Sequence, residues 1–344
     1  MSINTKYETV NYTDKFIRLA QNENPYGASP KAISAIQENL NLVSIYPDVK
    51  QQELRQLLAD KVKVDVSNIV VGAGSVSIIE TMIKTFVSKD EHIVIPKISF
   101  TAYKVLAEIY GVNFRIAEMN NYRTDLSIIS KLCDEKTKLV FLANPNNPTG
   151  TIFQHDELKQ FLEKLNPTTI VVIDEAYFEY VNDPSFPDSL SLLNKYPNVI
   201  ILRSFSKIYG LAGLRIGYGI AHQNIINKIE NQRTPFTINI LATVAANASL
   251  KDDDFIEYSI KNNDEQRSYL YAGLKNLGFN VLPSQANFLY LYFHNKIERD
   301  VIYDQLIDAG LQTRKMEPFG DEKALRISIG DERANHKIVA CLVH

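Results

Sequence analysis

The sequence predicts an α/β fold in which helices cover a mostly parallel central sheet, with a smaller α/β domain beside it. Short apolar runs alternate with helical patterns through the middle of the chain, and each run leads into a polar or glycine-rich segment. From about residue 251 the pattern changes to a long helical stretch and two further strand-like runs. We therefore predict a large domain over residues 45–250 and a small domain made of residues 1–44 and 251–344.

The expected strands of the large domain are rich in Val, Ile and Leu. The first two, 69–71 and 93–95, lead into helical patterns around residues 78–86 and 100–110. The other three comprise residues 138–142, 169–173 and 199–202. Because ligands of such sheets gather beyond the carboxyl ends of the strands, the segments that follow these runs predict a single pocket. The small domain is expected to contain strands at 288–293 and 324–329.

Composition excludes several classes of function. The chain has 344 residues, 45% of them hydrophobic, which is enough for a sizeable core and two domains, and a net charge of −3 gives no nucleic-acid signal. Its two cysteines are too few for a disulfide framework. No apolar run approaches the roughly 18 residues of a membrane span, and residues 1–12 lack the apolar core of a signal peptide. We expect a cytoplasmic protein that binds neither nucleic acid nor membrane.

One lysine lies just beyond the 199–202 run, in the segment Ser204-Phe205-Ser206-Lys207-Ile208-Tyr209-Gly210-Leu211-Ala212-Gly213-Leu214-Arg215. A lysine in this place can form a Schiff base with an aldehyde cofactor, and Ser204, Ser206 and Arg215 are suited to bind a phosphate. The alternative is a surface loop whose lysine faces water.

Two more motifs follow neighbouring strands. Residues 138–142 lead to Asn144-Pro145-Asn146-Asn147-Pro148-Thr149-Gly150, and residues 169–173 lead to Asp174-Glu175-Ala176-Tyr177. With the lysine segment, these motifs resemble, in the family order, the fold-type I aminotransferases that use pyridoxal phosphate (PLP). The resemblance runs from about residue 22 to 330.

Within that superfamily the chain is most similar to the histidinol-phosphate aminotransferases. The supporting stretches are Gln21-Asn22-Glu23-Asn24-Pro25, Tyr46-Pro47, Leu211-Ala212-Gly213-Leu214-Arg215, Pro283-Ser284-Gln285-Ala286-Asn287-Phe288 and Leu325-Arg326-Ile327-Ser328. Aminotransferases that act on aromatic amino acids share many of them.

The resemblance implies a catalytic role for three residues. Lys207 would bind the cofactor aldehyde and move the proton, and Asp174 would keep the pyridine nitrogen protonated. Tyr177 and Asn147 would hydrogen-bond the ring hydroxyl. Without the resemblance, Asp174 could be a helix N-cap, Tyr177 a packed side chain and Asn147 a turn residue.

Other residues would bind the cofactor from several directions. Ser75 and Val76 lie where a glycine-rich turn becomes a helix, so their N–H groups favour an anion and would complete the phosphate site with Ser204, Ser206 and Arg215. The resemblance implies that Phe100 stacks on the ring. It also implies that Tyr46 reaches the phosphate of the neighbouring subunit, hence a homodimer with shared sites.

The substrate residues implied by the resemblance are Arg326, which would bind an anion through a forked contact, Arg314 as a second arginine, and Asn22 and Asn24. No metal is expected. The chain has Val76-Ser77 where many relatives carry two acidic residues, and Thr237 where asparagine is common. These departures leave the exact substrate open.

The resemblance implies ping-pong transfer of an amino group between histidinol phosphate, or an aromatic amino acid, and 2-oxoglutarate. A PLP-dependent decarboxylase of the threonine-phosphate type is one alternative. Another is a non-catalytic PLP-binding module, against which the joint presence of Lys207, Asp174, Tyr177 and Asn147 argues.

Overall fold

The structure is a computed structural model that describes residues 16–343. The expectation about residues 1–12, and the first 15 residues of the predicted small domain, lie outside this range.

The large domain is built on a seven-stranded sheet. Its strands, in spatial order, are β2 (Ile69–Gly72), β8 (Gly217–Ala221), β7 (Val199–Ser204), β6 (Ile170–Asp174), β5 (Thr137–Ala143), β3 (His92–Pro96) and β4 (Asn113–Ala117). Only β8 runs against its neighbours, so the other six strands point the same way. The predicted, mostly parallel sheet is confirmed. The sequence analysis missed β4 and β8.

Both faces of this sheet are buried, which explains the nearly continuous apolar runs. Along β6, Ile170 and Val172 join one hydrophobic cluster, whereas Val171 and Ile173 join the other. The first cluster lies under α3 (Ser75–Phe86), α4 (Thr101–Ile109) and α8 (Gln223–Gln232). The second lies under α2 (Gln52–Val62), α5 (Leu126–Leu132), α6 (His155–Lys164) and α9 (Ile240–Ser249), while α7 (Ser189–Leu192) is a short helix before β7.

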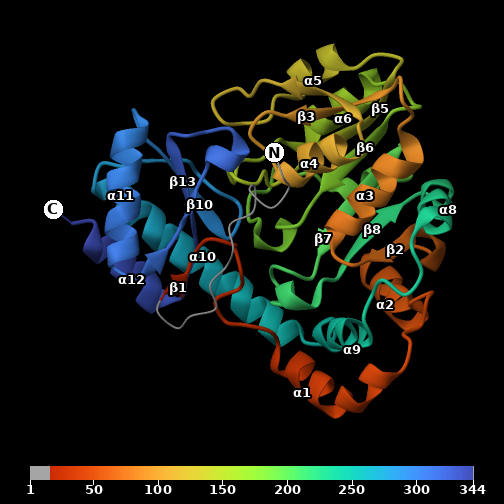
Figure 1. Ribbon diagram of the computed structural model, residues 1–344, viewed down its shortest axis with the longest axis horizontal. Helices are drawn as coiled ribbons and strands as arrows, with labels where there is room; N and C mark the ends of the chain where they lie inside the picture. The colour runs from red at the N-terminus through yellow and green to blue at the C-terminus, as the bar shows by residue number, and fades with distance from the viewer. Residues whose placement is uncertain (1–15, 344) are drawn as a thin grey trace.

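The small domain begins with the long helix α10 (Asp253–Asn276), which runs from α9 towards the blue C-terminal part of the molecule (Figure 1). A four-stranded antiparallel sheet has the order β12 (Arg314–Lys315), β13 (Ala324–Ser328), β10 (Phe288–Tyr292) and β9 (Asn280–Val281). Two further helices are α11 (Lys296–Asp308) and α12 (Glu332–Cys341). The predicted strands at 288–293 and 324–329 correspond to β10 and β13.

The described N-terminal segment contacts both parts of the chain. Strand β1 (Ile17–Arg18) pairs in parallel with β11 (Leu311–Gln312), and Leu19 belongs to the small-domain core. Helix α1 (Pro30–Glu38) instead packs against α9, and its Ala32 joins the large-domain core. The predicted domain limits remain a proposal, and these contacts would move the first boundary from residue 44 to a point before Pro30.

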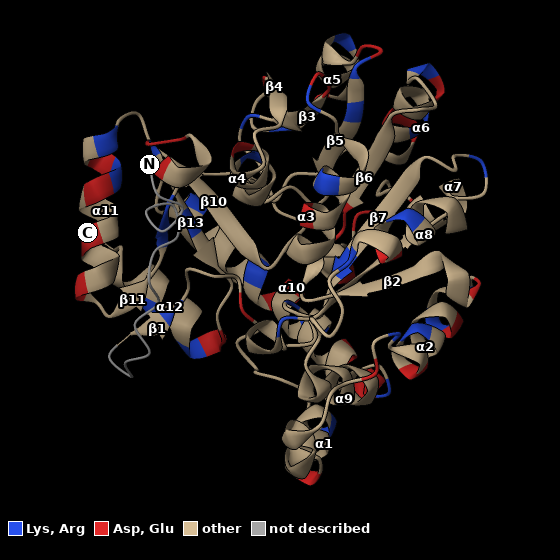
Figure 2. Cartoon of the chain, turned by 45° about the vertical axis from the view of Figure 1, so that its right-hand side comes forward, with Lys and Arg blue, Asp and Glu red and all other residues tan. Residues whose placement is uncertain are grey.

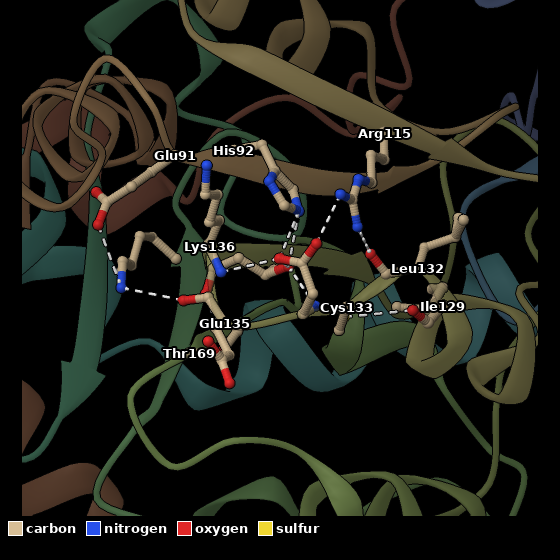
Figure 3. A network of polar contacts seen from close by, with 12 residues as sticks. Glu91, His92, Arg115, Ile129, Leu132, Cys133, Glu135, Lys136 and Thr169 are labelled. Carbon is tan, nitrogen blue, oxygen red and sulfur yellow. Dashed lines mark hydrogen bonds and ion pairs between the residues drawn. The ribbon is translucent and has the colours of Figure 1, made fainter.

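A polar network lies at the amino ends of β3 and β5, the end of the sheet away from the motif-bearing loops (Figure 3). Asp134 forms an ion pair of 2.6 Å with Arg115, and Nε2 of His92 lies 2.7 Å from Oγ1 of Thr137. Burial lowers the pKa of His92, the largest effect on that group. Because these contacts tie β3, β4 and the loop before β5 together, they hold one end of the sheet in register.

The surface carries charges of both signs. Acidic and basic positions alternate along outer helices such as α11 (Figure 2), in keeping with the net charge of −3. Among residues 16–343, no helix combines the length and the apolar character needed to cross a membrane.

Candidate active site

A cavity of about 240 Å³ lies where the carboxyl ends of β5, β6 and β7 face the small domain. It has room for a small molecule and not for a macromolecule. The structure brings most of the predicted site residues to its wall: Asn22, Ser75, Val76, Phe100, Asn147, Asp174, Tyr177, Ser204, Ser206, Lys207, Arg215, Arg314 and Arg326.

Asp174 is the last residue of β6 and is 4% exposed. Its Oδ2 accepts a hydrogen bond of 2.8 Å from the Tyr103 hydroxyl, and its Oδ1 accepts one of 3.2 Å from the main-chain N–H of Ala176. Burial raises the pKa of Asp174 to about 6, against the lowering effect of these two donors. A cationic partner inside the cavity would therefore stabilise the ionised form of this carboxylate.

Lys207 lies three residues after the end of β7. Its Nζ donates a hydrogen bond of 2.9 Å to the main-chain carbonyl of Gln21, and its charge meets the face of Tyr177 at 5.5 Å from the ring centroid. Burial, followed by the positive charge of Arg326, lowers the pKa of Lys207 to about 7. A large fraction of this amine is therefore neutral near physiological pH and able to act as a nucleophile.

The loop before α3 forms a cradle for an anion. Gly74 has a φ of +78°, and a Cβ there would lie 2.6 Å from Nη2 of Arg215. The cradle is completed by Arg215, whose Nη1 donates to Oγ of Ser206 at 3.2 Å, and by Ser204, whose Oγ accepts from the Ser206 N–H at 3.0 Å. First-turn N–H groups of α3, a guanidinium and two hydroxyls thus converge, as a phosphate site requires.

Tyr177 and Asn147 line the same cavity, and each has a partner from elsewhere in the chain. Asn22 Nδ2 donates to the Tyr177 hydroxyl at 3.0 Å, and Arg326 Nη1 donates to Asn147 Oδ1 at 2.5 Å. Burial raises the pKa of Tyr177, so its hydroxyl stays protonated and can donate.

Two arginines of the small domain also line the cavity. Arg314 and Arg326 are directly paired in the register of β12 and β13, and their exposed fractions are 5% and 2%. Both guanidinium groups lie over Phe319, with Cζ at 5.4 and 5.7 Å from the ring centroid. Within residues 16–343, the buried Nε of Arg326 has no hydrogen-bond partner, and burial lowers the pKa of this arginine. Two adjacent buried cations, one with an unused donor, fit an anionic ligand.

The structure places two predicted residues elsewhere. Asn24 does not line this cavity, since its Nδ2 donates to the carbonyl of Ile208 at 2.8 Å and to Ser259 Oγ at 3.2 Å. Its position holds the N-terminal segment in place, which does not support a direct substrate contact. Tyr46 is 82% exposed and does not line the cavity of its own chain. Its ring contacts that of Phe236 in a tilted arrangement, with 4.9 Å between ring centroids.

Among the residues at or next to the site that sequence reasoning missed, four have polar or aromatic side chains that bear on the chemistry: Gln21, Glu23, Phe319 and Tyr103. Gln21 and Glu23 line the cavity and lie inside a motif that the sequence analysis quoted, so their omission was avoidable. Phe319 also lines it, but no motif marks that position. Tyr103 lies behind the wall, and its spacing of three from Phe100 on a helical pattern was the available signal.

The described residues fit PLP. The buried carboxylate of Asp174 can meet a protonated pyridine nitrogen, and Lys207 can meet the aldehyde. The cradle around Gly74 and Arg215 can hold the phosphate, since only a glycine leaves space for the guanidinium there. Phe100 lines the same cavity and can lie against the ring.

The comparisons with known proteins agree with this site. The model of the class I and II aminotransferases matches residues 14–342. A histidinol-phosphate aminotransferase of Anaeromyxobacter sp. (strain Fw109-5) is 42% identical over 94% of this chain and 89% of its own. The crystal structure of a histidinol-phosphate aminotransferase from Sinorhizobium meliloti with pyridoxal-5'-phosphate has a TM-score of 0.87 at 26% identity, covering 94% of this chain and 89% of that one.

The L-threonine-O-3-phosphate decarboxylase of Porphyromonas gingivalis has a TM-score of 0.81 at 24% identity, covering 94% of this chain and 97% of its own, which shows a common fold alone. With a family model that matches nearly the whole chain and a relative at 42% identity, the chain belongs to the class I and II aminotransferases.

Proposed function

We propose that this PLP-dependent aminotransferase moves an amino group between histidinol phosphate and 2-oxoglutarate. The observation that carries the proposal is the pair of buried arginines, Arg314 and Arg326, in the wall of the cavity that also contains the lysine. Related enzymes named histidinol-phosphate aminotransferase, at 36% to 42% identity over most of the chain, support the choice of donor.

PLP, when bound, supplies an aldehyde that holds the amino group and a ring that accepts electrons from the substrate carbon. The residues of this chain supply the remaining functions. Lys207 takes up and returns the proton at its Nζ, Asp174 holds a proton on the ring nitrogen, and Tyr177 donates from its hydroxyl. The cradle of Ser75, Ser204, Ser206 and Arg215 fixes the phosphate and so orients the reacting atoms towards Lys207.

The arginine pair explains how one pocket can serve two unlike substrates. Both half-reactions of a ping-pong transfer use the same site in turn. Histidinol phosphate has a phosphate and no carboxylate, whereas 2-oxoglutarate has two carboxylates. Each has an anion at one end, and a guanidinium can make a forked contact with either anion. We propose that Arg326 and Arg314 bind this shared terminal anion.

A panel of amino donors tests the proposal. The loaded enzyme is given histidinol phosphate, aromatic amino acids and threonine phosphate, with 2-oxoglutarate present, and both glutamate formation and carbon dioxide release are measured. We expect glutamate to form fastest with histidinol phosphate and no gas to be released. Faster transfer from an aromatic amino acid would mean that this amino acid, and not histidinol phosphate, is the amino donor. Carbon dioxide release would support the decarboxylase alternative.

We also propose that the enzyme is a cytosolic homodimer with shared sites. Large apolar side chains gather on the exposed segment around the short helix Leu40–Ser44: Val43 is 66% exposed, Ile45 56% and Tyr46 82%, beside Phe236 at 47%. Such a patch is typical of a surface that another molecule covers. Both cysteines, Cys133 and Cys341, are free thiols, as the cytosol would keep them.

Mixing two inactive variants tests the shared site. If Tyr46 serves the partner's site, a hybrid dimer of Tyr46→Ala and Lys207→Ala chains has one site with both defects and one intact site. Activity should then reappear on mixing. If each site is complete within one chain, both sites of the hybrid are defective and mixing restores nothing, which would remove Tyr46 from its proposed role.

A further inference from the structure

Tyr103, in the first turn of α4, is fully buried and lies directly behind the cavity wall. Its hydroxyl donates the 2.8 Å hydrogen bond to Asp174 Oδ2. Its ring stacks on Phe141 of β5, with centroids 4.8 Å apart and planes at 15°, so the hydroxyl is held at a fixed place. The contact therefore joins a rigid donor to the carboxylate that faces the ring nitrogen.

The same ring also positions the residue expected to lie on the cofactor. Phe100 meets Tyr103 edge to face, at 5.5 Å between centroids and 88° between planes. Such an arrangement is favoured for aromatic pairs. One side chain thus contacts both the residue at the face of the cofactor ring and the residue at its nitrogen.

The hydrogen bond from Tyr103 affects the ionisation of Asp174, because burial and a neighbouring charge both favour the protonated carboxyl. Burial raises the pKa of Asp174, and the neighbouring Glu175 raises it further, whereas Tyr103, the Ala176 N–H and the more distant Lys207 lower it. Among these lowering groups, Tyr103 has the largest effect. Tyr177 also faces Asp174, but its hydroxyl stays protonated because burial raises its pKa.

We propose that Tyr103 is a positioning residue of the cofactor site: its hydroxyl keeps Asp174 ionised and aimed, so that a shared proton stays on the cofactor's ring nitrogen. Asp174 and that nitrogen compete for one proton. A donor to the carboxylate makes the carboxylate a weaker base, and the proton then stays on the ring. Without the hydroxyl, the proton shifts to Asp174 and the ring becomes a poorer electron acceptor. The inference rests on the proposed place of Asp174 against the ring nitrogen.

The test is Tyr103→Phe, which removes the hydroxyl and keeps the ring. The enzyme is loaded with PLP that carries ¹⁵N in the ring, and the nitrogen chemical shift is recorded at pH 7.5. We expect the wild-type signal in the range of a protonated nitrogen and the variant's signal displaced towards that of an unprotonated one.

Tyr110→Phe is the matched control. Tyr110 caps the same helix and donates its hydroxyl to Glu80 at the surface, so this change removes an equivalent contact outside the site. It should leave the nitrogen signal at the wild-type position. An identical signal in wild type, Tyr103→Phe and Tyr110→Phe would overturn the inference.

The variant Asp174→Ala distinguishes a failure of the role proposed for Tyr103 from a failure of the role proposed for Asp174. If Asp174→Ala leaves the nitrogen signal unchanged, the role of Asp174 itself fails. If Asp174→Ala moves the signal and Tyr103→Phe does not, only the role of Tyr103 fails.

A second measurement serves if the phenylalanine variant does not load PLP. With 3-fluorotyrosine at position 103, the ¹⁹F signal should differ between enzyme loaded with PLP and enzyme loaded with 1-deaza-PLP, which lacks the ring nitrogen. Equal signals in the two forms would contradict a proton shared across Asp174.

Discussion

The amine of Lys207 donates a 2.9 Å hydrogen bond to the main-chain carbonyl of Gln21, a residue 186 positions earlier in the chain. Gln21 itself is held by the small domain, since its side-chain oxygen accepts a 2.9 Å hydrogen bond from Arg314 Nη1. The N-terminal segment therefore fixes the direction in which the lysine points before any ligand arrives.

The lowered pKa of Lys207, about 7, predicts how PLP attaches to the unloaded protein. The neutral amine is the nucleophile, so the attachment rate at fixed PLP should rise about tenfold per pH unit below 7 and level off above it. Stopped-flow absorbance measures this rate. A rate that keeps rising up to pH 10 would contradict the lowered pKa.

In Lys207→Ala, borohydride reduction followed by mass spectrometry should find no cofactor bound to the chain, and cofactor on another lysine would refute the assignment.

Asp174→Asn should keep PLP bound and slow the chemical step severely. An amide can still accept a hydrogen bond, but its neutral oxygen cannot stabilise a positive charge on the ring nitrogen. The phosphate cradle lies elsewhere in the cavity, so the dissociation constant should change less than the single-turnover rate. Near-normal turnover in this variant would remove Asp174 from its role.

Arg326→Ala should impair both half-reactions, by about 2–4 kcal/mol each in transition-state free energy if a buried charged contact is lost. Arg326→Lys should recover only part, because an ammonium cannot make the forked contact. Single-turnover rates with histidinol phosphate and, separately, with 2-oxoglutarate measure the two effects. Arg333→Ala, an exposed position on α12, is the control and should change neither rate. A loss confined to one half-reaction would mean that the two substrates use separate anion sites.

Gly217→Ala should weaken PLP binding although Gly217 itself does not line the cavity. A Cβ on Gly217, in β8, would lie 2.5 Å from the main-chain N of Ser75, at the start of α3. The first turn of the cradle must then shift, and we expect the dissociation constant of PLP to rise at least tenfold, measured by fluorescence titration. Gly213→Ala is the control, since a Cβ there meets nothing within 4 Å. Equal affinities for the two variants would contradict this prediction.

Glu175→Gln should lower the free energy of unfolding by about 3–5 kcal/mol. Glu175 and Arg203 form an ion pair of 2.9 Å with side-chain exposures of 1% and 7%. Removing the negative charge leaves the buried guanidinium without its ion-pair partner, and among carboxylates only the weaker attraction of Glu179 remains. The face of Phe178, 3.7 Å from Cζ of Arg203, offsets only part of this cost. Urea unfolding measures the change. Glu163→Gln, which loses a mostly exposed pair with Lys195, should cost less than about 1 kcal/mol, and similar costs for both variants would show that burial does not decide the effect.

The parallel core of the fold was predictable because its strands are buried on both faces and leave uninterrupted apolar runs, as in β5 and β6. Strand β8 was missed since its sequence, Gly-Tyr-Gly-Ile-Ala, has two glycines and the low strand propensity they bring. Packing requires the first of these glycines, since a Cβ on Gly217 would lie 2.5 Å from the main-chain N of Ser75, and it leaves little space at the second, where a Cβ on Gly219 would lie 3.0 Å from the side chain of Val70. The nearest neighbours that limit the space at these glycines belong to β2 and α3, so the sequence of β8 alone does not explain the two glycines.

The site residues likewise include some that the sequence predicts and some that it does not. Asp174 ends β6, and Asn147 and Lys207 come within a few residues of the ends of β5 and β7, so sequence order alone predicts that they meet at one edge of the sheet. Phe319 reaches the cavity only through the packing of the small domain. Its neighbours in the sequence, Glu317 and Pro318, give no sign of that place.

The cavity is assembled from both ends of the chain, and this determines when during synthesis it can be finished. Arg326, close to the C-terminus, donates to the carbonyl of Ala20 at 2.6 Å, and Ser328 Oγ donates to Asn22 Oδ1 at 3.0 Å. A nascent chain that has produced only the large domain already contains the phosphate cradle, Lys207 and Asp174. Such a chain could capture PLP while still on the ribosome, but it would have no arginine pair to select a substrate. Cofactor loading can therefore precede substrate selectivity by the time needed to make and fold the last part of the chain.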